Sequence, residues 1–270
     1  MFPISTFNFY LLPVSSPESF LHHSGLAPLD WNEVLQRIEC QLTPLETQTF
    51  RRLHGALAAY PTPHTVRSFY DFAAQRELLP VLASFRFERL VDLCAALLKL
   101  NGTEGNAGAF FAGKRILDYG AGGGYLADFL RTLGADVTVT DFSPATVRSL
   151  ASKGFSTLPA AAPEVSGLRF DLILCADSLG EVHADEDDWL SAPEHLDDPL
   201  YPAELEARYG FAEKLASLRP LLAPGGTVLV FEPIPLPHFW LGAARALEAA
   251  GWTAEVLGPP ASGLKLEGRR

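Results

Sequence analysis

The sequence predicts an α/β protein in which a helical N-terminal region precedes a parallel sheet with helices on both faces. The first observation is that apolar residues between Phe20 and Asn101 recur three and four positions apart, as they do in packed helices. The second is that short apolar runs alternate with amphipathic stretches from Arg115 onward, which is typical of a parallel sheet with crossover helices. We therefore expect a helical cap region at residues 1–112 and an α/β domain at residues 113–270.

The N-terminal helices are predicted by groups of apolar residues at helical spacing. We expect one helix after Asp30, another after Thr43–Pro44, and a third that ends at the polar, glycine-bearing break at residues 101–106. The three groups are Trp31, Val34, Leu35 and Ile38; Phe50, Leu53 and Leu57; and Leu90, Leu93, Leu97 and Leu98.

The α/β domain is predicted strand by strand from its short apolar runs. Ser143–Pro144 supplies an N-cap and a first-turn proline for a helix that Gly154 ends, between the second and third strands. The C-terminal runs are short for a final pair of strands, so they leave the edge of the sheet open. The expected strands are Arg115–Tyr119, Val137–Thr140, a short one at Phe155–Leu158, Phe170–Ala176 and Thr227–Phe231, with Glu255–Leu257 and Leu264–Leu266 as the short runs.

A glycine-rich turn lies between the first buried strand and its helix. Gly120, Gly122 and Gly124 would let the backbone approach a ligand closely and direct free N–H groups at it. Asp141 ends the next strand, 21 residues after Gly120, where a carboxylate can accept hydrogen bonds from both ribose hydroxyls. These residues predict a site for an adenosine-bearing cofactor, and they fit a dinucleotide as well as other adenosine cofactors.

Four motifs in order resemble the class I S-adenosylmethionine-dependent methyltransferases, from about residue 113 to the C-terminal end. The last two, with a Pro-Gly-Gly turn before a strand, are not expected of a nicotinamide-binding domain. The resemblance therefore implies a Rossmann-like methyltransferase sheet and S-adenosylmethionine as the cofactor. The motifs are Ile116–Gly124, Asp141–Ser143, Phe170–Leu179 and Leu218–Thr227.

The resemblance also assigns roles around the cofactor. It implies that the three glycines line its methionine end, that Asp141 holds the ribose and that Phe142 flanks the adenine. Asp118 would lie beneath the loop, near the cofactor's amino group. The family often has an acid after the third strand for the adenine amine, but Ala160–Pro163 stands there and Glu164 comes only afterwards, so that contact stays unassigned.

Candidate catalytic residues follow the fourth strand. Asp177, Glu181 and His183 come at the carboxyl edge of the sheet, where ligands bind, and could reach a methyl acceptor. Asp177 is predicted either to contact the cofactor or acceptor or to cap a helix. His238 and Trp240, after the fifth strand, could line the same mouth, with ordinary packing as the alternative.

The charge of the chain is concentrated in one segment. Its net charge is −11, and ten acids with no Lys or Arg lie between Glu181 and Glu206, while the rest carries 22 acids and 21 bases. This segment is predicted to be a solvated loop, a lid for a cationic acceptor or a divalent-metal site. No other residues suggest a metal site, and no basic stripe with interleaved aromatics suggests a nucleic-acid partner.

Composition also bears on the cellular setting. No run approaches the ~20 apolar residues of a membrane span, and no secretory signal is expected. Three separated cysteines without paired spacing favour a reducing, cytoplasmic location. The sequence makes no prediction of oligomeric state.

The function favoured by these residues is methyl transfer to a small-molecule acceptor, with the N-terminal helices shaping the acceptor pocket. A protein side chain as acceptor stays open. Two alternatives keep the fold: a non-catalytic cofactor-binding scaffold, and an enzyme that transfers an aminopropyl group from the decarboxylated cofactor. A nicotinamide cofactor is a third alternative.

Overall fold

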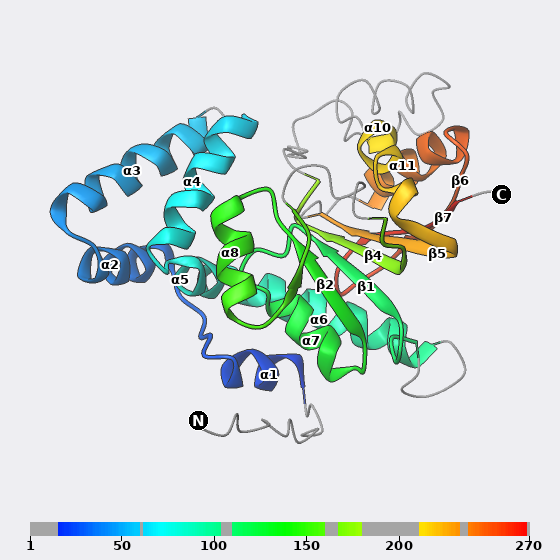
Figure 1. Cartoon of the computed structure of the whole chain (residues 1–270), viewed down its shortest axis with the longest axis horizontal. Coiled ribbons are helices and arrows are strands. Elements are labelled where there is room, and N and C mark those ends of the chain that lie inside the picture. Colours follow the sequence, from blue (N-terminus) through cyan, green and yellow to red (C-terminus); the bar gives the residue numbers. More distant parts are fainter. Residues whose placement is uncertain are drawn as a thin grey trace.

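The computed structural model describes residues 16–59, 62–103, 110–159, 167–179, 211–232 and 237–268, and Figure 1 shows their arrangement. The helices of the N-terminal region are α1 (Pro17–His23), α2 (Trp31–Gln41), α3 (Pro44–Ala59), α4 (Pro63–Gln75), α5 (Leu79–Phe85) and α6 (Phe87–Thr103). The later helices are α7 (Tyr125–Thr132), α8 (Pro144–Ser152), α10 (Phe211–Ala216) and α11 (Pro237–Ala249), with a short 3₁₀ turn at Arg219–Leu221. The strands are β1 (Arg115–Tyr119), β2 (Asp136–Thr140), β3 (Ser156–Thr157), β4 (Phe170–Ala176), β5 (Leu222–Phe231), β6 (Trp252–Leu257) and β7 (Gly263–Gly268).

The strands form one seven-stranded sheet in the order β3-β2-β1-β4-β5-β7-β6. Neighbours from β3 to β5 are parallel, and β7 pairs antiparallel with both β5 and β6. The five strands expected from the apolar runs are confirmed, two of them at the expected bounds. The chain reverses direction along the sheet between β1 and β4, so β1 and β4 end side by side at the edge where α/β proteins bind ligands.

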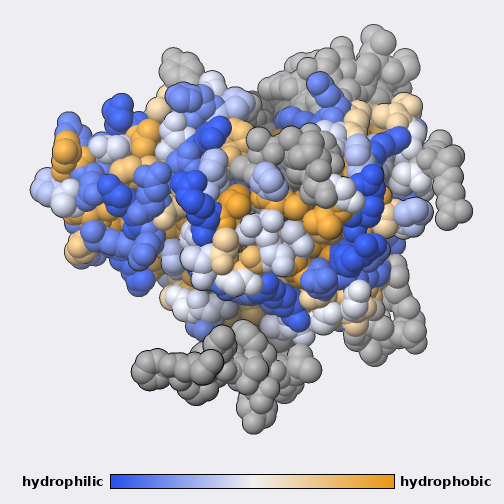
Figure 2. Space-filling model, viewed as in Figure 1, coloured by the Kyte–Doolittle hydropathy of each residue, from blue (hydrophilic) through white to orange (hydrophobic). Residues whose placement is uncertain are grey.

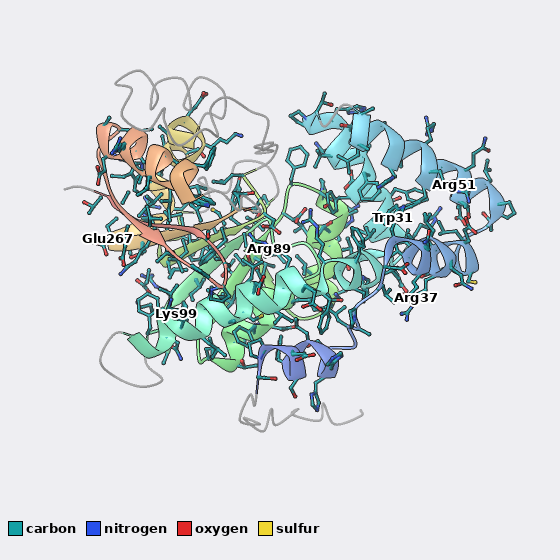
Figure 3. The ribbon with its side chains drawn as sticks, turned by 180° about the vertical axis from the view of Figure 1, so that it is seen from behind. Trp31, Arg37, Arg51, Arg89, Lys99 and Glu267 are labelled. Atoms are coloured by element: carbon teal, nitrogen blue, oxygen red, sulfur yellow. The ribbon has the colours of Figure 1, made fainter. Side chains whose placement is uncertain are left out.

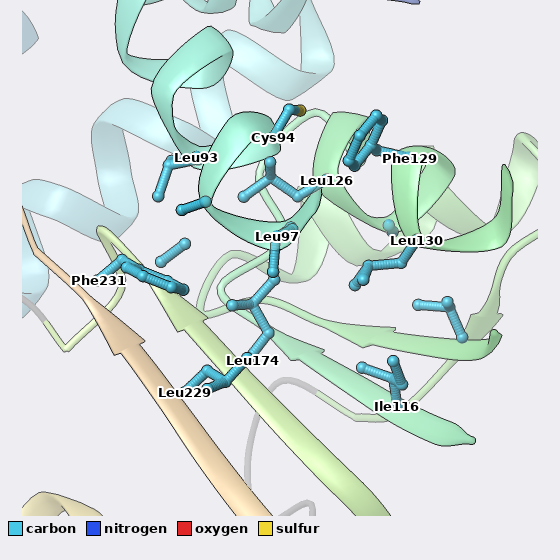
Figure 4. Close-up of a cluster of buried hydrophobic side chains, with 14 of the residues drawn as sticks. Leu93, Cys94, Leu97, Ile116, Leu126, Phe129, Leu130, Leu174, Leu229 and Phe231 are labelled. Carbon is cyan, nitrogen blue, oxygen red and sulfur yellow. The ribbon is translucent and has the colours of Figure 1, made fainter. Parts of the chain in front are cut away.

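Both faces of the sheet are buried, which explains why its strands read as nearly continuous apolar runs. In β4, for example, Leu172 and Leu174 face one core while Ile173 and Cys175 face the other. Helices α1, α6 and α7 cover the first face, and α10 and α11 cover the second. Figure 4 shows part of the first core, where Leu97 of α6 lies over the sheet.

Side-chain caps fix where several helices begin. Asp30 accepts a hydrogen bond from the Glu33 N–H, and the Asp30 N–H donates to the Glu33 carboxylate, so α2 begins with a complete capping box. The Ser143 hydroxyl accepts from the Thr146 N–H before Pro144, as the sequence predicts for α8. The starts of these helices are therefore encoded locally.

Helices α2 to α5 form a layer with its own apolar cluster, beside α8 in Figure 1. The cluster is built around Val34, Ile38, Phe50 and Phe69, and it includes Ala145 of α8. Helices α1 and α6, by contrast, share a core with the sheet. The division at residues 112 and 113 stays a prediction. We call α2–α6 the helical cap below.

The last two strands close the sheet as a hairpin. Its strands are longer than the two short apolar runs suggested, because Gly263, Glu267 and Gly268 of β7 also pair with β6. Gly263 allows β7 to lie close to β5, since an added Cβ would lie 2.1 Å from the Val230 carbonyl oxygen of β5. The hairpin of β6 and β7 therefore forms the edge of the sheet that the sequence left undecided.

No helix in the described part of the chain has the length and apolarity needed to cross a membrane. Figure 2, in the view of Figure 1, shows apolar side chains gathered at the middle of this face and mostly hydrophilic side chains over α2 and α3.

Candidate functional site

The glycine-rich turn joins β1 to α7 at the carboxyl edge of the sheet. The Gly120 and Ala121 N–H groups both donate to the Thr140 carbonyl oxygen at 3.0 Å, which ties the turn to β2. Gly120, Gly122 and Gly124 have φ values of 83°, 52° and 84°, which glycine adopts without strain. Gly124 is the N-cap of α7, so the turn opens directly onto a helix N-terminus.

The three glycines differ in what an added side chain would meet. A Cβ at Gly120 would lie 2.3 Å from the Ser178 Cβ, and one at Gly124 would lie 2.7 Å from Leu150. A Cβ at Gly122 would meet no described atom within 4 Å, and Gly122 lines a cavity. Two of the glycines thus allow close packing within the protein, while Gly122 leaves space for a ligand.

Asp141 lies at the end of β2 and fastens the turn. One carboxylate oxygen accepts from the Gly122 N–H and the other from the Ser143 N–H, both at 2.9 Å. Burial raises the pKa of Asp141, and the two N–H groups oppose that shift. Phe142, next in the chain, is 47% exposed at the rim of the cavity. The carboxylate and the ring therefore lie beside the glycine turn.

Asp118 lies in β1 and is buried. Its Oδ2 atom has no hydrogen-bond partner among the described residues. Burial raises its pKa to about 7, with a further increase from the charge of Asp141, while a hydrogen bond from the Ala127 N–H lowers it. Asp118 does not line the cavity itself. It is a buried acid with spare hydrogen-bonding capacity close to the glycine turn.

Asp177 directly follows β4 and pairs with the helical cap. Its Oδ1 accepts from Arg89 Nη2 at 2.8 Å and from Arg89 Nε at 3.2 Å, and Arg86 Nη1 lies 3.5 Å from Oδ2. Asp177 has a φ of 50°, an unusual backbone conformation for a non-glycine residue. Figure 3 shows Arg89 at the centre of the molecule, where α6 passes the sheet. Asp177 therefore joins the sheet to the cap.

One cavity of about 360 Å³ extends from the glycine turn into the helical cap. Its volume lies at the lower end of the range for small-molecule sites. The sheet side contributes residues of the turn together with Asp141, Phe142, Asp177 and Ser178. The cap side contributes mainly apolar and aromatic residues from α2 to α6: Trp31, His54, Leu57, Val66, Phe69, Tyr70, Leu79, Leu82, Ala83, Phe85, Arg86, Arg89, Leu90 and Leu93.

A family model described as a methyltransferase domain matches residues 82–257, which is more than half of the chain. The chain belongs to this methyltransferase-domain family. The Rossmann-like fold, the methyltransferase activity and S-adenosylmethionine as the methyl donor, all implied by the motifs, are thereby confirmed.

Several solved structures are similar to the methyltransferase. Magnesium protoporphyrin IX methyltransferase from Synechocystis PCC 6803 with bound SAM is 15% identical, with a TM-score of 0.47, and the match covers 77% of this chain and 97% of that chain. The ribosomal protein L11 methylase from Lactobacillus delbrueckii subsp. bulgaricus is 18% identical, with a TM-score of 0.40 and coverage of 65% and 77%. The 16S rRNA N2 G1207 methyltransferase of T. thermophilus is 19% identical, with a TM-score of 0.41 and coverage of 66% and 42%. No curated protein is similar enough in sequence to count as a match.

The structure brings together only some of the predicted residues around the methyltransferase site. Gly120, Gly122, Asp141, Phe142 and Asp177 line the cavity. Glu181 and His183 lie outside the described residues, as does the rest of the acidic segment. Trp240 of α11 is fully buried in the core against the sheet, so of its two interpretations ordinary packing is the correct one. The side chain of His238 is not described.

The cap is also attached to the cofactor side through α4. Asp71 Oδ1 accepts from the Ser143 hydroxyl at 2.5 Å and from the Ala145 N–H at 3.2 Å. Ser143 is the N-cap of α8 and lies two residues from Asp141. Two contacts therefore join the cap to the α/β part of the chain. Asp71 binds the start of α8 close to Asp141, and Arg89 pairs with Asp177 at the end of β4.

Glu232 is a buried acid that the sequence analysis missed. It follows β5, and its Oε1 accepts from the Ser178 N–H at 3.0 Å and the Leu179 N–H at 2.9 Å. Burial raises the pKa of Glu232 to about 7, and the nearby charge of Asp177 adds to the increase. An acid directly after the buried run at Thr227–Phe231, at the carboxyl edge of the sheet, is the signal that could have found it.

Replacing Glu232 by glutamine is expected to alter how stability depends on pH. Because the pKa rises from 4.5 to about 7 on folding, the folded protein holds a proton over this range that the unfolded chain releases. This contribution is therefore largest at low pH and is lost as the pH rises through about 7. Glutamine does not titrate, so the wild-type advantage over Glu232→Gln should shrink by up to about 1.4 kcal/mol per pH unit in this window.

Urea unfolding of both proteins at several pH values between 4.5 and 8 measures this difference. Gln keeps an oxygen that can accept the two N–H bonds, and exposed Glu88 on α6 provides the control substitution Glu88→Gln. A constant free-energy difference between wild type and Glu232→Gln across this range would contradict the prediction.

Proposed function

We propose that this methyltransferase transfers a methyl group from S-adenosylmethionine to a small-molecule acceptor held between the glycine turn and the helical cap. The observation that carries the proposal is that a single cavity is lined by both. The donor site and the cap walls are therefore continuous, as required for an acceptor lone pair to approach behind the transferred methyl group. The largely apolar cap walls suit a small organic molecule.

The described residues fit the cofactor in the following way. Gly122 would leave room for its methionine end, with Gly120 and Gly124 shaping the turn, and Asp141 would accept hydrogen bonds from the ribose hydroxyls. Phe142 offers an exposed ring for the adenine. These roles are proposals supported by the geometry.

Two buried or partly buried acids have further proposed roles. Asp118, with its unpaired Oδ2, would meet the cofactor's amino group. Asp177 lines the cavity while it pairs with Arg89, so it would act on the cofactor or acceptor as part of an ion pair. We retain Glu181 and His183 as proposed catalytic groups from the sequence, because they follow Asp177 in the chain. No proton-transfer step is assigned to them.

A nucleic-acid acceptor is the weaker proposal because the net charge is −11 and the sequence lacks a basic stripe. A cytoplasmic setting is also proposed, supported by the three cysteines, which are all free.

Calorimetric titration with S-adenosylmethionine, its demethylated product, decarboxylated S-adenosylmethionine and NADH tests the cofactor assignment. We expect saturable binding of the first two and much weaker binding of the others. Preference for the decarboxylated compound would instead support aminopropyl transfer, and failure of folded protein to bind either of the first two would overturn the proposal.

Methyl-labelled S-adenosylmethionine then tests the acceptor class in a cell extract. Label is expected in the fraction of small molecules, and label confined to RNA or protein would contradict a small-molecule acceptor. Absence of transfer to every fraction, with cofactor binding intact, would favour the scaffold alternative.

A further inference from the structure

We propose that the cap side of the cavity binds a planar aromatic acceptor that bears a hydroxyl group, and that His54 accepts the hydrogen bond from that hydroxyl. This inference rests on the proposed function and narrows its acceptor class. It is carried by the position of His54, by the lack of a hydrogen-bond partner for its ring nitrogens among the described residues, and by the walls around it.

His54 lies on α3, half-buried, and its ring is held between aromatic neighbours. The Trp31 ring stacks on it with centroids 4.5 Å apart and an interplanar angle of 27°. Phe50 stacks at 6.0 Å and 14°, and Phe69 lies at 6.1 Å. Figure 3 shows Trp31 among the cap helices. Stacking occupies the faces of the imidazole ring and leaves its edge, which carries the two nitrogens, for polar contacts.

The ring nitrogens of His54 have no hydrogen-bond or ion-pair partner among the described residues. Two other histidines of the N-terminal region do have such partners: His22 Nδ1 lies 3.0 Å from the Leu26 carbonyl oxygen, and His23 Nδ1 lies 2.7 Å from that of Ser19. Burial lowers the pKa of His54, which favours the neutral ring. A neutral imidazole has one nitrogen that can accept a hydrogen bond.

The walls around His54 select the kind of molecule that it would contact. Leu57, Val66, Leu79 and Leu82 supply apolar surface, and the aromatic side chains of the cap supply rings that pair favourably with another ring. Both cationic side chains that the described cap helices contribute to the cavity, Arg86 and Arg89, already lie against Asp177. His54 is therefore the neutral base of this apolar compartment.

The proposal distinguishes two probes with the same ring system and oxygen atom, one with a hydroxyl hydrogen to donate and one with a methyl group in its place. 2-Naphthol has a hydroxyl group, and 2-methoxynaphthalene has the same ring system without a donor. We expect wild-type protein saturated with the demethylated cofactor to bind 2-naphthol about tenfold more tightly, which corresponds to one hydrogen bond. Calorimetric titration measures both affinities.

The variant His54→Phe keeps an aromatic ring for stacking and removes the acceptor nitrogen. In this variant the two probes are expected to bind with about equal affinity, and the affinity for 2-methoxynaphthalene should remain within about threefold of the wild-type value. His64→Phe is the matched control because His64 is exposed on neighbouring α4 and does not line the cavity. This control is expected to keep the wild-type preference.

Three results would overturn the inference: no preference in wild type, no binding of either probe, or the same preference in His54→Phe as in wild type. Should His54→Phe fail to fold, His54→Ala carries the same expectation for the ratio of affinities. Failure of the demethylated cofactor to bind would instead overturn the proposed function, and the two failures are therefore distinguishable.

Discussion

Replacing Asp141 by alanine is expected to weaken S-adenosylmethionine binding about 100-fold, or by about 3 kcal/mol. Under the proposed function the carboxylate would accept hydrogen bonds from the ribose hydroxyls, and it accepts hydrogen bonds from the Gly122 and Ser143 N–H groups at 2.9 Å. The alanine variant therefore loses proposed ligand contacts and the hydrogen bonds that fix the turn. Calorimetric titration with the cofactor and its demethylated product measures the change.

The control for this substitution lies at the other end of the same strand. Asp136 is exposed at the start of β2, and Asp136→Ala should bind the cofactor as wild type does. Asp141→Asn keeps the size of the side chain and isolates the effect of charge. Equal affinity of Asp141→Ala and wild type would refute the ribose assignment.

Alanine at Gly122 is expected to reduce cofactor affinity at least tenfold while the protein remains folded. The new Cβ would meet no described protein atom within 4 Å, but it would occupy ligand space in the cavity. The φ of 52° adds about 1–2 kcal/mol of destabilisation. Calorimetry and thermal unfolding separate the loss of affinity from the loss of stability.

Two other glycines provide the comparison for Gly122→Ala. Gly154→Ala also places alanine at positive φ with no atom within 4 Å, but Gly154 does not line the cavity, so affinity should remain within about twofold. Gly120→Ala should unfold more easily by about 3 kcal/mol or more, because its Cβ would overlap Ser178. Parallel effects of Gly122→Ala and Gly154→Ala on affinity would show that Gly122 does not face the cofactor.

Much of the fold could be predicted from the sequence because its signals are local. The apolar run at Phe170–Ala176 is a strand buried on both faces, and Ser143–Pro144 begins a helix through its own cap. The run at Leu264–Leu266 was harder to interpret, because its extension to a six-residue strand depends on pairing with β5 and β6. Strand length at the edge of a sheet is set by neighbours that local composition does not reveal.

Only the glycine-turn side of the cavity could be predicted from the sequence. The glycine turn and Asp141 carry a recognisable spacing, whereas Arg89 is 88 residues from its partner Asp177 and no spacing links them. The aromatic surroundings of His54 could not be predicted either. Phe50 lies one turn away on the same helix, but Trp31 and Phe69 come from other helices. Residues that define an acceptor pocket come together through tertiary packing.

The apolar cluster of α2–α5 is separate from the core that packs against the sheet, and this separation matters for engineering. Its buried members come from these helices and their connecting segments, with Ala145 as the contribution from the α/β part of the described chain. Cavity-lining side chains of this cluster, such as Phe69 and Leu57, can therefore be exchanged with less disturbance of the sheet core than Leu93, which belongs to that core. Engineering of the acceptor specificity proposed for this chain would begin with the first group of side chains and leave the second unchanged.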